Sequence, residues 1–221
     1  MTHACAALAV IATMLAAPAN ADQPSPAQSA VQRAVDAWRP VKTVRASFEQ
    51  YVANALTGTN AHASGEYQQQ RPGRLAVRFH DPNGDQIIAD GSFVWLYLPS
   101  SAPGQVIKRP LGREGTGTVD LTSEFLDAPL TKYDLADGGP ESLDRRATHV
   151  VRLTPKPGTT ADFTNARVWI DDVDGFIRQF EVREASGVTR RVHITSLSVN
   201  VPVDDAAFKF VVPNGVRVVT R

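Results

Sequence analysis

Four histidines follow residue 21, and they are the first side chains to consider for metal binding or acid–base chemistry. His62, His80, His149 and His193 lie far apart, and no pair has the His-x-x-x-His spacing of a helical metal site. The stretch after residue 21 also contains no cysteine that could complete a mixed site. A bound metal needs three or four ligands held close together, so the sequence predicts no metal site. The histidines are expected on the surface or in strands.

The acidic stretch Asp171-Asp172-Val173-Asp174-Gly175 has the composition of a calcium-binding loop. If Gly175 stood at the glycine position of an EF-hand loop, the first ligand position would fall on Ile170 and the last on Glu181. An isoleucine side chain has no oxygen with which to bind calcium. Gly175 can instead supply the left-handed residue of a hairpin, so the stretch is predicted to be a turn between two strands.

Gly112, Gly115 and Gly117 form a stretch that looks like a phosphate-binding loop, but it lacks the Gly-Lys-Ser/Thr ending and the third glycine of a dinucleotide fingerprint. It is expected to be a flexible connection. The chain also has no Gly-x-Ser-x-Gly elbow, and no serine stands at a recognisable spacing from a histidine and an acid. A lipid hydrolase would therefore lack its nucleophile and base. We expect a binding protein without a cofactor rather than an enzyme.

Arg71, immediately before Pro72, has two alternative roles. One is an exposed arginine at the start of a strand, with no further function. The other places the guanidinium group at the rim of a cavity, where its N–H groups donate hydrogen bonds to backbone carbonyls of a covering helix or loop. Such bonds can break and form again without disturbing a core. The residues alone leave both roles open.

The elements that must position these side chains are mostly strands. Between Glu66 and Leu98, apolar and polar residues alternate in short runs that Pro, Gly, Asn and Asp interrupt, which is typical of antiparallel strands with one solvated face. Residues 54–64 are predicted to be a loop. Strands are predicted at 44–52, 75–80, 86–90, 93–98, 105–109, 148–153, 163–171, 176–183 and 188–199.

Two helices are predicted beside the strands. Ser25 can cap a helix that begins at Pro26 and ends before Pro40, because Gln28 completes a capping box and apolar residues recur at helical spacing. A second, short helix is predicted over 119–127, ending before Pro129. Two helices are too few to cover so wide a sheet. The sheet either closes into a filled barrel or stays partly open around a cavity lined by apolar residues, and the sequence leaves both possibilities open.

The first 21 residues have the composition of an export signal. An apolar run from Ala4 to Ala17 is too short to span a bilayer, and Ala19-Asn20-Ala21 is a small-x-small cleavage site. Cleavage is expected near Ala21, in a protein of the bacterial periplasm. The only cysteine, Cys5, lies inside this segment, so residues 22–221 can form no disulfide.

Basic and acidic residues balance at 23 each, which gives a net charge of zero. A nucleic-acid partner would require a basic surplus, so none is expected. Residues 22–221 form a stretch of about 200 residues, long enough for one domain to bury its own core. A single domain over 22–221 and a monomer are expected.

Seven short motifs occur between residues 48 and 216 in the order and spacing of a known family. They are Phe48-Glu49-Gln50, Arg71-Pro72-Gly73-Arg74-Leu75, the run from Asp90 to Tyr97, Leu153-Thr154-Pro155-Lys156, Ile170-Asp171, Gly175-Phe176-Ile177, and Phe208-Lys209-Phe210 with Pro213-Asn214-Gly215-Val216. Together they resemble the LolA-type periplasmic lipoprotein carrier family over essentially all of residues 22–221.

This resemblance implies an incomplete β-barrel with a helical lid over an apolar cavity. It also implies a carrier that takes acylated lipoproteins from an ABC-type release complex of the inner membrane and passes them to an outer-membrane acceptor. Arg71 would hold the lid, and Leu75, Val77 and Phe79 would face the cavity. The stretch Glu124-Phe125-Leu126 with Leu130 resembles the lid insertion.

The side chains expected around the acyl chains come partly from the resemblance and partly from the strand faces. In the strand 93–98 the aliphatic residues are expected inside, because Trp and Tyr more readily present a polar edge to water. The full expected set is Phe48, Leu75, Val77, Phe79, Val94, Leu96, Phe125 and Leu126. A second role fits the same fold, namely a periplasmic sensor or regulator that binds lipids or lipoproteins as a signal.

Overall fold

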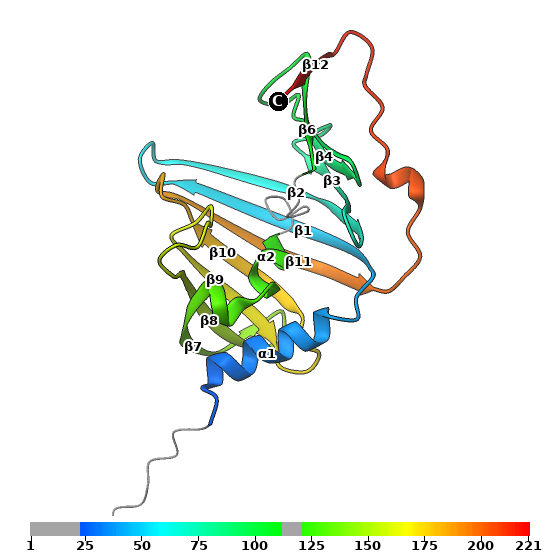
Figure 1. Ribbon diagram of the computed structural model, residues 1–221. Helices are drawn as coiled ribbons and strands as arrows, with labels where there is room; N and C mark the ends of the chain where they lie inside the picture. Colours follow the sequence, from blue (N-terminus) through cyan, green and yellow to red (C-terminus); the bar gives the residue numbers. More distant parts are fainter. Residues whose placement is uncertain (1–22, 112–120) are drawn as a thin grey trace, which may run out of the picture.

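One strongly curved sheet makes up most of the computed structural model, which describes residues 23–111 and 121–221 (Figure 1). The predicted loop at Gly112–Thr118 lies outside the described residues. The strands are β1 (Thr43–Asn54), β2 (Thr59–Gln70), β3 (Arg74–Asp81), β4 (Gln86–Asp90), β5 (Phe93–Tyr97), β6 (Gln105–Pro110), β7 (Tyr133–Leu143), β8 (Arg146–Pro155), β9 (Asn165–Asp171), β10 (Ile177–Arg183), β11 (Val188–Val199) and β12 (Arg217–Thr220). The helices are α1 (Pro26–Trp38), α2 (Leu121–Leu126), α3 (Pro129–Lys132) and the 3₁₀ turn η1 (Asp205–Phe208).

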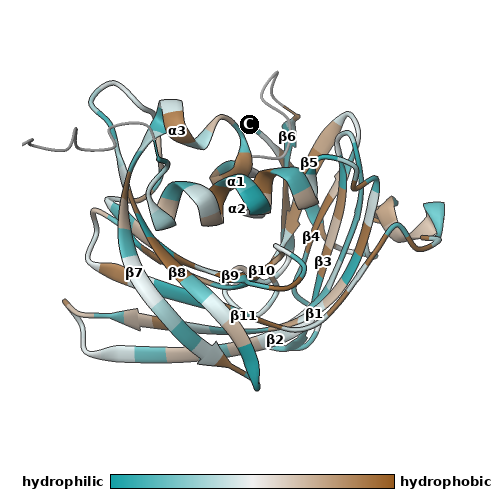
Figure 2. Cartoon of the chain, turned by 90° about the horizontal axis from the view of Figure 1, so that it is seen from below, coloured by the Kyte–Doolittle hydropathy of each residue, from teal (hydrophilic) through white to brown (hydrophobic). Residues whose placement is uncertain are grey.

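The twelve strands follow the order β12-β6-β5-β4-β3-β2-β1-β11-β10-β9-β8-β7. Neighbours pair antiparallel, except that β12 runs parallel to β6. The sheet curls so that α1, α2 and α3 lie over its concave side (Figure 2). The predicted incomplete β-barrel with a helical cover is confirmed, and the parallel β12 is an addition to it.

The segment after β11 returns along the outside of the sheet to reach β12 (Figure 1). Phe208 of η1 is buried there against Ala76 of β3 and Ile88 of β4. Trp95 of β5 stacks on Phe210, with ring centroids 5.3 Å apart. These contacts lie on the convex face, so the C-terminal segment covers the back of the strands whose other face is concave.

The first helix forms as the sequence predicts. The Ser25 hydroxyl accepts a hydrogen bond from the Gln28 backbone N–H, and the Gln28 side chain accepts one from the Ser25 N–H, which is a complete capping box. Its buried face packs against β7, β8 and β9. The β9–β10 turn comes so close that a Cβ on Gly175 would lie 2.9 Å from the Arg33 carbonyl oxygen. Gly175 has φ of 76°, as predicted for the hairpin.

The loop predicted over 54–64 is mostly wrong. Only Ala55 to Gly58 form a turn, and β2 begins at Thr59 opposite Asn54. Small residues such as Ala61, Ala63 and Gly65 weaken the strand signal. The unbroken pairing with β1, from Asn54 to Thr43, supplies the stability that these residues do not.

Strand β7 was not predicted at all. Its run of Gly138-Gly139-Pro140 is typical of a turn, and the pairing with β8 shifts register between Asp137 and Gly139. Because β7 is the edge of the sheet, a proline without an N–H and a bulge are tolerated there.

The helix predicted over 119–127 ends at Leu126, one residue earlier than predicted, and Pro129 begins a further helix. The described helix α2 ends at Leu126, Ala128 takes a left-handed conformation with φ of 48°, and Pro129 begins α3. Proline suits the first turn of a helix because its missing N–H has no partner there in any case.

Candidate functional site

A cavity of about 730 Å³ lies on the concave face of the sheet. Its wall contains one row of side chains that stand directly opposite each other across six strands: Ala46, Tyr67, Val77, Ile87, Leu96 and Ile107. Directly opposite residues of antiparallel strands share a face of the sheet, so register alone makes this wall continuous. The concave face of this region is therefore an apolar hollow rather than a packed core.

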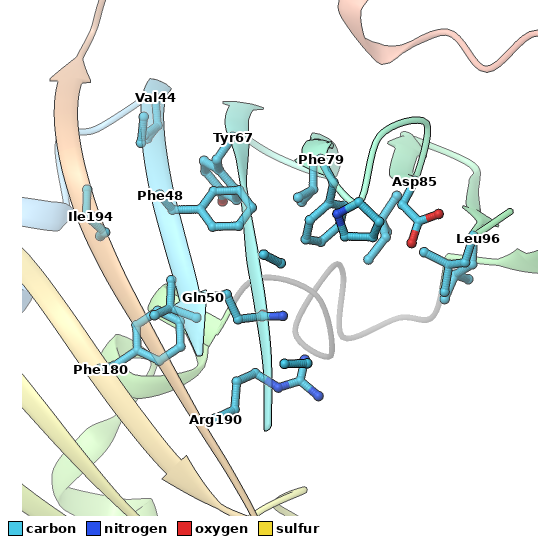
Figure 3. A pocket seen from close by; sticks show the side chains of 18 of the residues that line it. Val44, Phe48, Gln50, Tyr67, Phe79, Asp85, Leu96, Phe180, Arg190 and Ile194 are labelled. Atoms are coloured by element: carbon cyan, nitrogen blue, oxygen red, sulfur yellow. The ribbon is translucent and has the colours of Figure 1, made fainter. Parts of the chain in front are cut away.

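The next row of the wall is aromatic. Phe48 of β1 stands opposite Ile194 of β11, and its ring meets that of Phe79 edge to face, with centroids 5.6 Å apart. Figure 3 shows the two rings on the same side of the strands, with Tyr67 beside them. Trp38, the last residue of α1, also lines the cavity and connects it to the helical cover.

The expected cavity residues divide into three groups. Phe48, Val77, Phe79 and Leu96 line the cavity.

Leu75 and Val94 are buried in the same hydrophobic cluster but are not among the described lining residues. Both stand in a row one step nearer α1, through the pairs Leu75 with Ala89 and Ala89 with Val94. Neighbouring side chains cover them, so they support the wall from the same face.

Phe125 and Leu126 are placed by α2 in the other half of the sheet. The Phe125 ring packs against Phe180 and Phe163, with centroids 5.5 Å and 5.8 Å away. Leu126 packs beside the same core cluster and beside the cluster around Trp38. Phe180 itself lines the cavity, so Phe125 stands behind the wall rather than in it.

Arg71 lies at the β2–β3 turn and reaches the C-terminal end of α1. Its Nη1 donates to the carbonyl oxygens of Trp38 and Val41, at 3.0 Å and 3.1 Å. The last carbonyls of a helix have no partner within the helix and carry the negative end of its dipole. The guanidinium carbon also lies 5.6 Å from the centroid of the Trp38 ring. Arg71 therefore joins the end of α1 to the wall strands β2 and β3.

Most of the remaining wall was missed from the sequence. Tyr67, Ile107 and Leu197 line the cavity without having been singled out. Tyr67 belongs to β2, whose strand signal was weak. The alternation in β6 and β11 did identify strands, but nothing in it told the concave face from the convex one.

Asp85 is a buried acid at the cavity, and its partners account for it. The carboxylate accepts hydrogen bonds from the Ser100 backbone N–H at 3.0 Å and from the Ser100 hydroxyl at 2.5 Å. It thereby fixes the turn after β5. Figure 3 places it beside Leu96, at the side of the cavity away from Val44.

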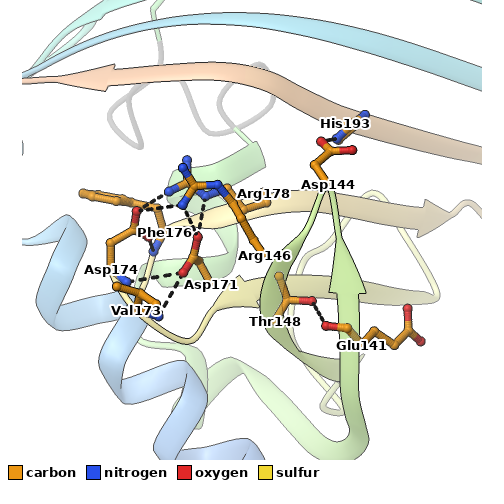
Figure 4. Close-up of polar contacts among 10 residues, drawn as sticks. All are labelled: Glu141, Asp144, Arg146, Thr148, Asp171, Val173, Asp174, Phe176, Arg178 and His193. Carbon is orange, nitrogen blue, oxygen red and sulfur yellow. Dashed lines mark hydrogen bonds and ion pairs between the residues drawn. The ribbon is translucent and has the colours of Figure 1, made fainter.

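In the acidic stretch of the β9–β10 turn, the carboxylates of Asp171 and Asp174 bind arginine side chains (Figure 4). Asp171 is fully buried, and its carboxylate accepts from Arg146 Nη1 at 2.8 Å, from Arg178 Nε at 3.1 Å and from the Val173 N–H at 2.9 Å. Burial raises the pKa of Asp171, but these hydrogen bonds outweigh it and hold the pKa below the ordinary value. Asp174 accepts from Arg178 as well. The turn predicted here is confirmed, and its carboxylates stabilise the hairpin on which α1 rests.

The described residues hold no group of three or more His, Cys, Asp and Glu side chains arranged to bind a metal. Among residues 23–111 and 121–221, no helix is long and apolar enough to cross a bilayer.

Comparison with known proteins agrees with this architecture. The sequence profile described as "Outer membrane lipoprotein carrier protein LolA" matches residues 39–121 and 132–211. A relative from Cupriavidus necator, named outer-membrane lipoprotein carrier protein, is 31% identical over 222 residues that cover 100% of this chain and 98% of that protein. A protein of the same name from Halorhodospira halophila is 29% identical over 202 residues, covering 85% of this chain and 84% of its own length.

A solved structure shows the same fold at low sequence identity. The crystal structure of an uncharacterized conserved protein from Thermus thermophilus has a TM-score of 0.56 and 15% identity, covering 89% of this chain and 100% of that chain. The profile match spans well over half of the sequence and includes the strands that build the cavity wall. The chain therefore belongs to the LolA family of outer membrane lipoprotein carrier proteins.

Proposed function

We propose that this protein is a periplasmic carrier that shields the acyl chains of lipoproteins in its cavity. In this proposal it takes them from an ABC-type release complex of the inner membrane and delivers them to an outer-membrane acceptor. The observation that carries the proposal is the continuous apolar wall across six strands. Family membership supports it, because the relatives described above are named for carrying outer-membrane lipoproteins.

The size of the cavity suits a long acyl chain. If each methylene group takes roughly the 30 Å³ that one water occupies in the liquid, a cavity of 730 Å³ holds on the order of 24 groups. Removing one CH₂ group from water is worth about 0.8 kcal/mol, so a chain with some 14 buried carbons is held by about 11 kcal/mol. A lipid tail in water would lose that stabilisation, which is why it needs a carrier to cross an aqueous compartment.

The helical cover gives the carrier a means of loading and release. Arg71 is proposed to hold the cover, since its two hydrogen bonds end on backbone carbonyls beside Trp38, which lines the cavity. Breaking them removes no core contact. Opening at this point would expose the wall, and closing would restore the same bonds.

The remaining parts of the proposal concern location and assembly. Residues 1–21 are proposed to direct export and to be removed near Ala21, and the mature protein is proposed to act as a monomer without catalytic activity. N-terminal sequencing of the protein purified from the periplasm tests the cleavage, and its mass in solution tests the monomer.

Native mass spectrometry of the protein purified from its own periplasm tests the carrier function. Bound peptides whose N-terminal cysteine is acylated are expected. Free lipid without any acylated peptide would contradict the carrier and favour a lipid sensor. Chemical turnover of added lipid would instead support the hypothesis of a lipid hydrolase.

A further inference from the structure

The cavity changes from apolar to polar along its length. On β1 the concave side chains are Val44, Ala46 and Phe48, and the next one is Gln50. On the paired strand β11, the lining residues in the matching direction are Leu197, Ile194, Val192 and then Arg190. Two strands that pair in register therefore become polar at the same end of the hollow, the end away from α1.

Gln50 and Arg190 lie together at this end. Gln50 stands opposite Val192, and Arg190 stands opposite Val52, one step further along the same face. Figure 3 shows both side chains beside Phe180, with the amide and the guanidinium group extended to the side on which Phe48 projects. Both are partly buried. The polar end thus presents hydrogen-bond donors at the edge of an apolar surface.

The donors of Arg190 are only partly used. Its Nη2 donates to Glu184 Oε1 over 3.3 Å, a long bond between half-exposed groups, and a guanidinium group has five N–H donors. Among the described residues, Gln50 has no side-chain hydrogen-bond partner. His62 is also among the lining residues, but its ring packs against Tyr51, 4.8 Å between centroids, on the face opposite to Gln50.

The next residue on β11 shows what an arginine with a purely structural role looks like. Arg191 points to the opposite face, where Nε and Nη2 both donate to Glu181 Oε2, at 2.9 Å and 2.6 Å. Its charge is matched on the surface of the sheet. Arg190 has the same charge but lines the cavity, and its one side-chain hydrogen bond, to Glu184, is longer.

We infer that Gln50 and Arg190 form a subsite for the acceptor oxygens at the head of an acyl chain, a carboxylate or an ester group, while the tail extends past Phe48 to Trp38. This inference rests on the proposed function, since it requires that acyl chains occupy the cavity. The apolar rows stabilise the tail, and hydrogen bonds from a guanidinium group are roughly twice as strong as bonds between neutral groups. In the reverse orientation the oxygens would lie near Val44 and Ala46, whose side chains offer no donor, and beside Arg71, whose Nη1 already donates to two backbone carbonyls.

Fluorescent probes with and without head oxygens test the subsite in the purified protein. The probes are cis-parinaric acid, its methyl ester and diphenylhexatriene, which has no oxygen. Arg190→Gln is expected to weaken binding of the acid about tenfold, to weaken the ester less and to leave diphenylhexatriene unchanged. Arg191→Gln, the matched control on the convex face, should change none of the three.

Removing the competing carboxylate should act in the opposite direction. Glu184→Gln frees Arg190, so it is expected to strengthen binding of the acid and leave diphenylhexatriene unchanged. A purely structural role for Arg190 predicts no such gain. The subsite is wrong if Arg190→Gln leaves acid binding unchanged, or if it weakens all three probes equally. If diphenylhexatriene fails to bind even the parent protein, the apolar cavity itself fails as a binding site, and the proposed function fails with it.

Trp38 can report the orientation of the chain. Of the three tryptophans, it alone is among the described lining residues, because Trp95 stacks on Phe210 and Trp169 donates to Glu141. A stearic acid brominated near its methyl end should quench Trp38 more strongly than one brominated near its carboxyl group. Trp38→Phe should abolish the difference. Stronger quenching by the carboxyl-end bromine would overturn the proposed orientation.

Discussion

The two halves of the sheet use the same alternating strands for opposite purposes. Strands β7 to β10 carry α1 and α2, and their concave side chains form a close-packed core with the rings of Phe125, Tyr133, Phe163 and Phe180. Strands β1 to β6 and β11 present a comparable apolar face to a cavity of about 730 Å³. The strand pattern is alike in both halves, and the difference lies in what covers it.

The cover depends on small residues in the first helix. Ala27, Ala30 and Ala34 are almost completely buried, so α1 can approach the strands closely and fill the space above them. Helix α1 ends at Trp38, and the part of the cavity wall beyond Trp38 has no helix packed against it. An amphipathic helix of limited length therefore divides one sheet into a core and a hollow.

The largest expected effect is on stability, and it should distinguish the halves. Phe125→Ala removes a ring from the filled half and should lower the free energy of unfolding by about 4 kcal/mol, because the cavity left behind cannot collapse. Phe79→Ala, the control in the open half, should cost less than half as much, since its ring already borders empty space. Urea unfolding measures both. Equal losses would show that the two halves are packed alike.

A charge in the open half should act on binding instead. Val77→Glu places a carboxylate in the middle of the apolar row, where an acyl chain would have to desolvate it. Affinity for diphenylhexatriene is expected to fall more than tenfold while the circular dichroism spectrum is retained. A variant that binds as well as the parent would remove Val77 from the wall.

Arg71, which connects the two halves, should contribute little to the free energy of unfolding but should be needed for lipoprotein transfer. Arg71→Leu loses two hydrogen bonds at a partly exposed site and should reduce the free energy of unfolding by about 1 kcal/mol. Transfer of lipoproteins between membranes should nevertheless be impaired, because the end of α1 is no longer held. Normal transfer by the folded variant would exclude Arg71 as the residue that holds the cover.

The smallest expected effect is a dependence on acid in the filled half. The pKa of Asp171 is lowered from its ordinary value of 3.8, so its contribution is present above that pH and is lost as the pH falls through the lower, folded-state value. Arg146→Gln should raise that pKa and move the loss of stability to higher pH. Arg39→Gln, which disrupts an exposed pair with Asp36, is the control. The free energy of unfolding, measured at several acidic pH values, tests this prediction. If its dependence on pH were identical in the parent and in Arg146→Gln, the role of Arg146 would be ruled out.

The sequence predicted the features that depend on local patterns. The capping box at Ser25, the turn at Gly175 and the alternation around Val77 each need only a few neighbouring residues. Strand β2 was partly missed because its stability comes from pairing with β1, which is a property of two distant segments.

The sequence predicted that an apolar cavity was one of two possibilities, but it identified only some of the residues that line the cavity. The faces of β3 and β5 follow from alternation, and Val77 and Leu96 line the cavity. Leu75 shares that face, and only its distance from α1 decides that it is covered. The polar end at Arg190 depends on the register of β11 against β1, which includes an irregularity at Ser47/Phe48 that alternation does not reveal.

An unclosed sheet exposes two strands to the surrounding solution, and each is a potential template for aggregation. On β7 the residues that obscured the strand are Gly138-Gly139-Pro140 and the adjacent bulge, and such features disfavour the addition of a neighbouring strand. At the opposite margin β12 is only four residues long and begins with Arg217, which limits the template there. Both margins of the open barrel thus carry features that disfavour edge-to-edge pairing of strands.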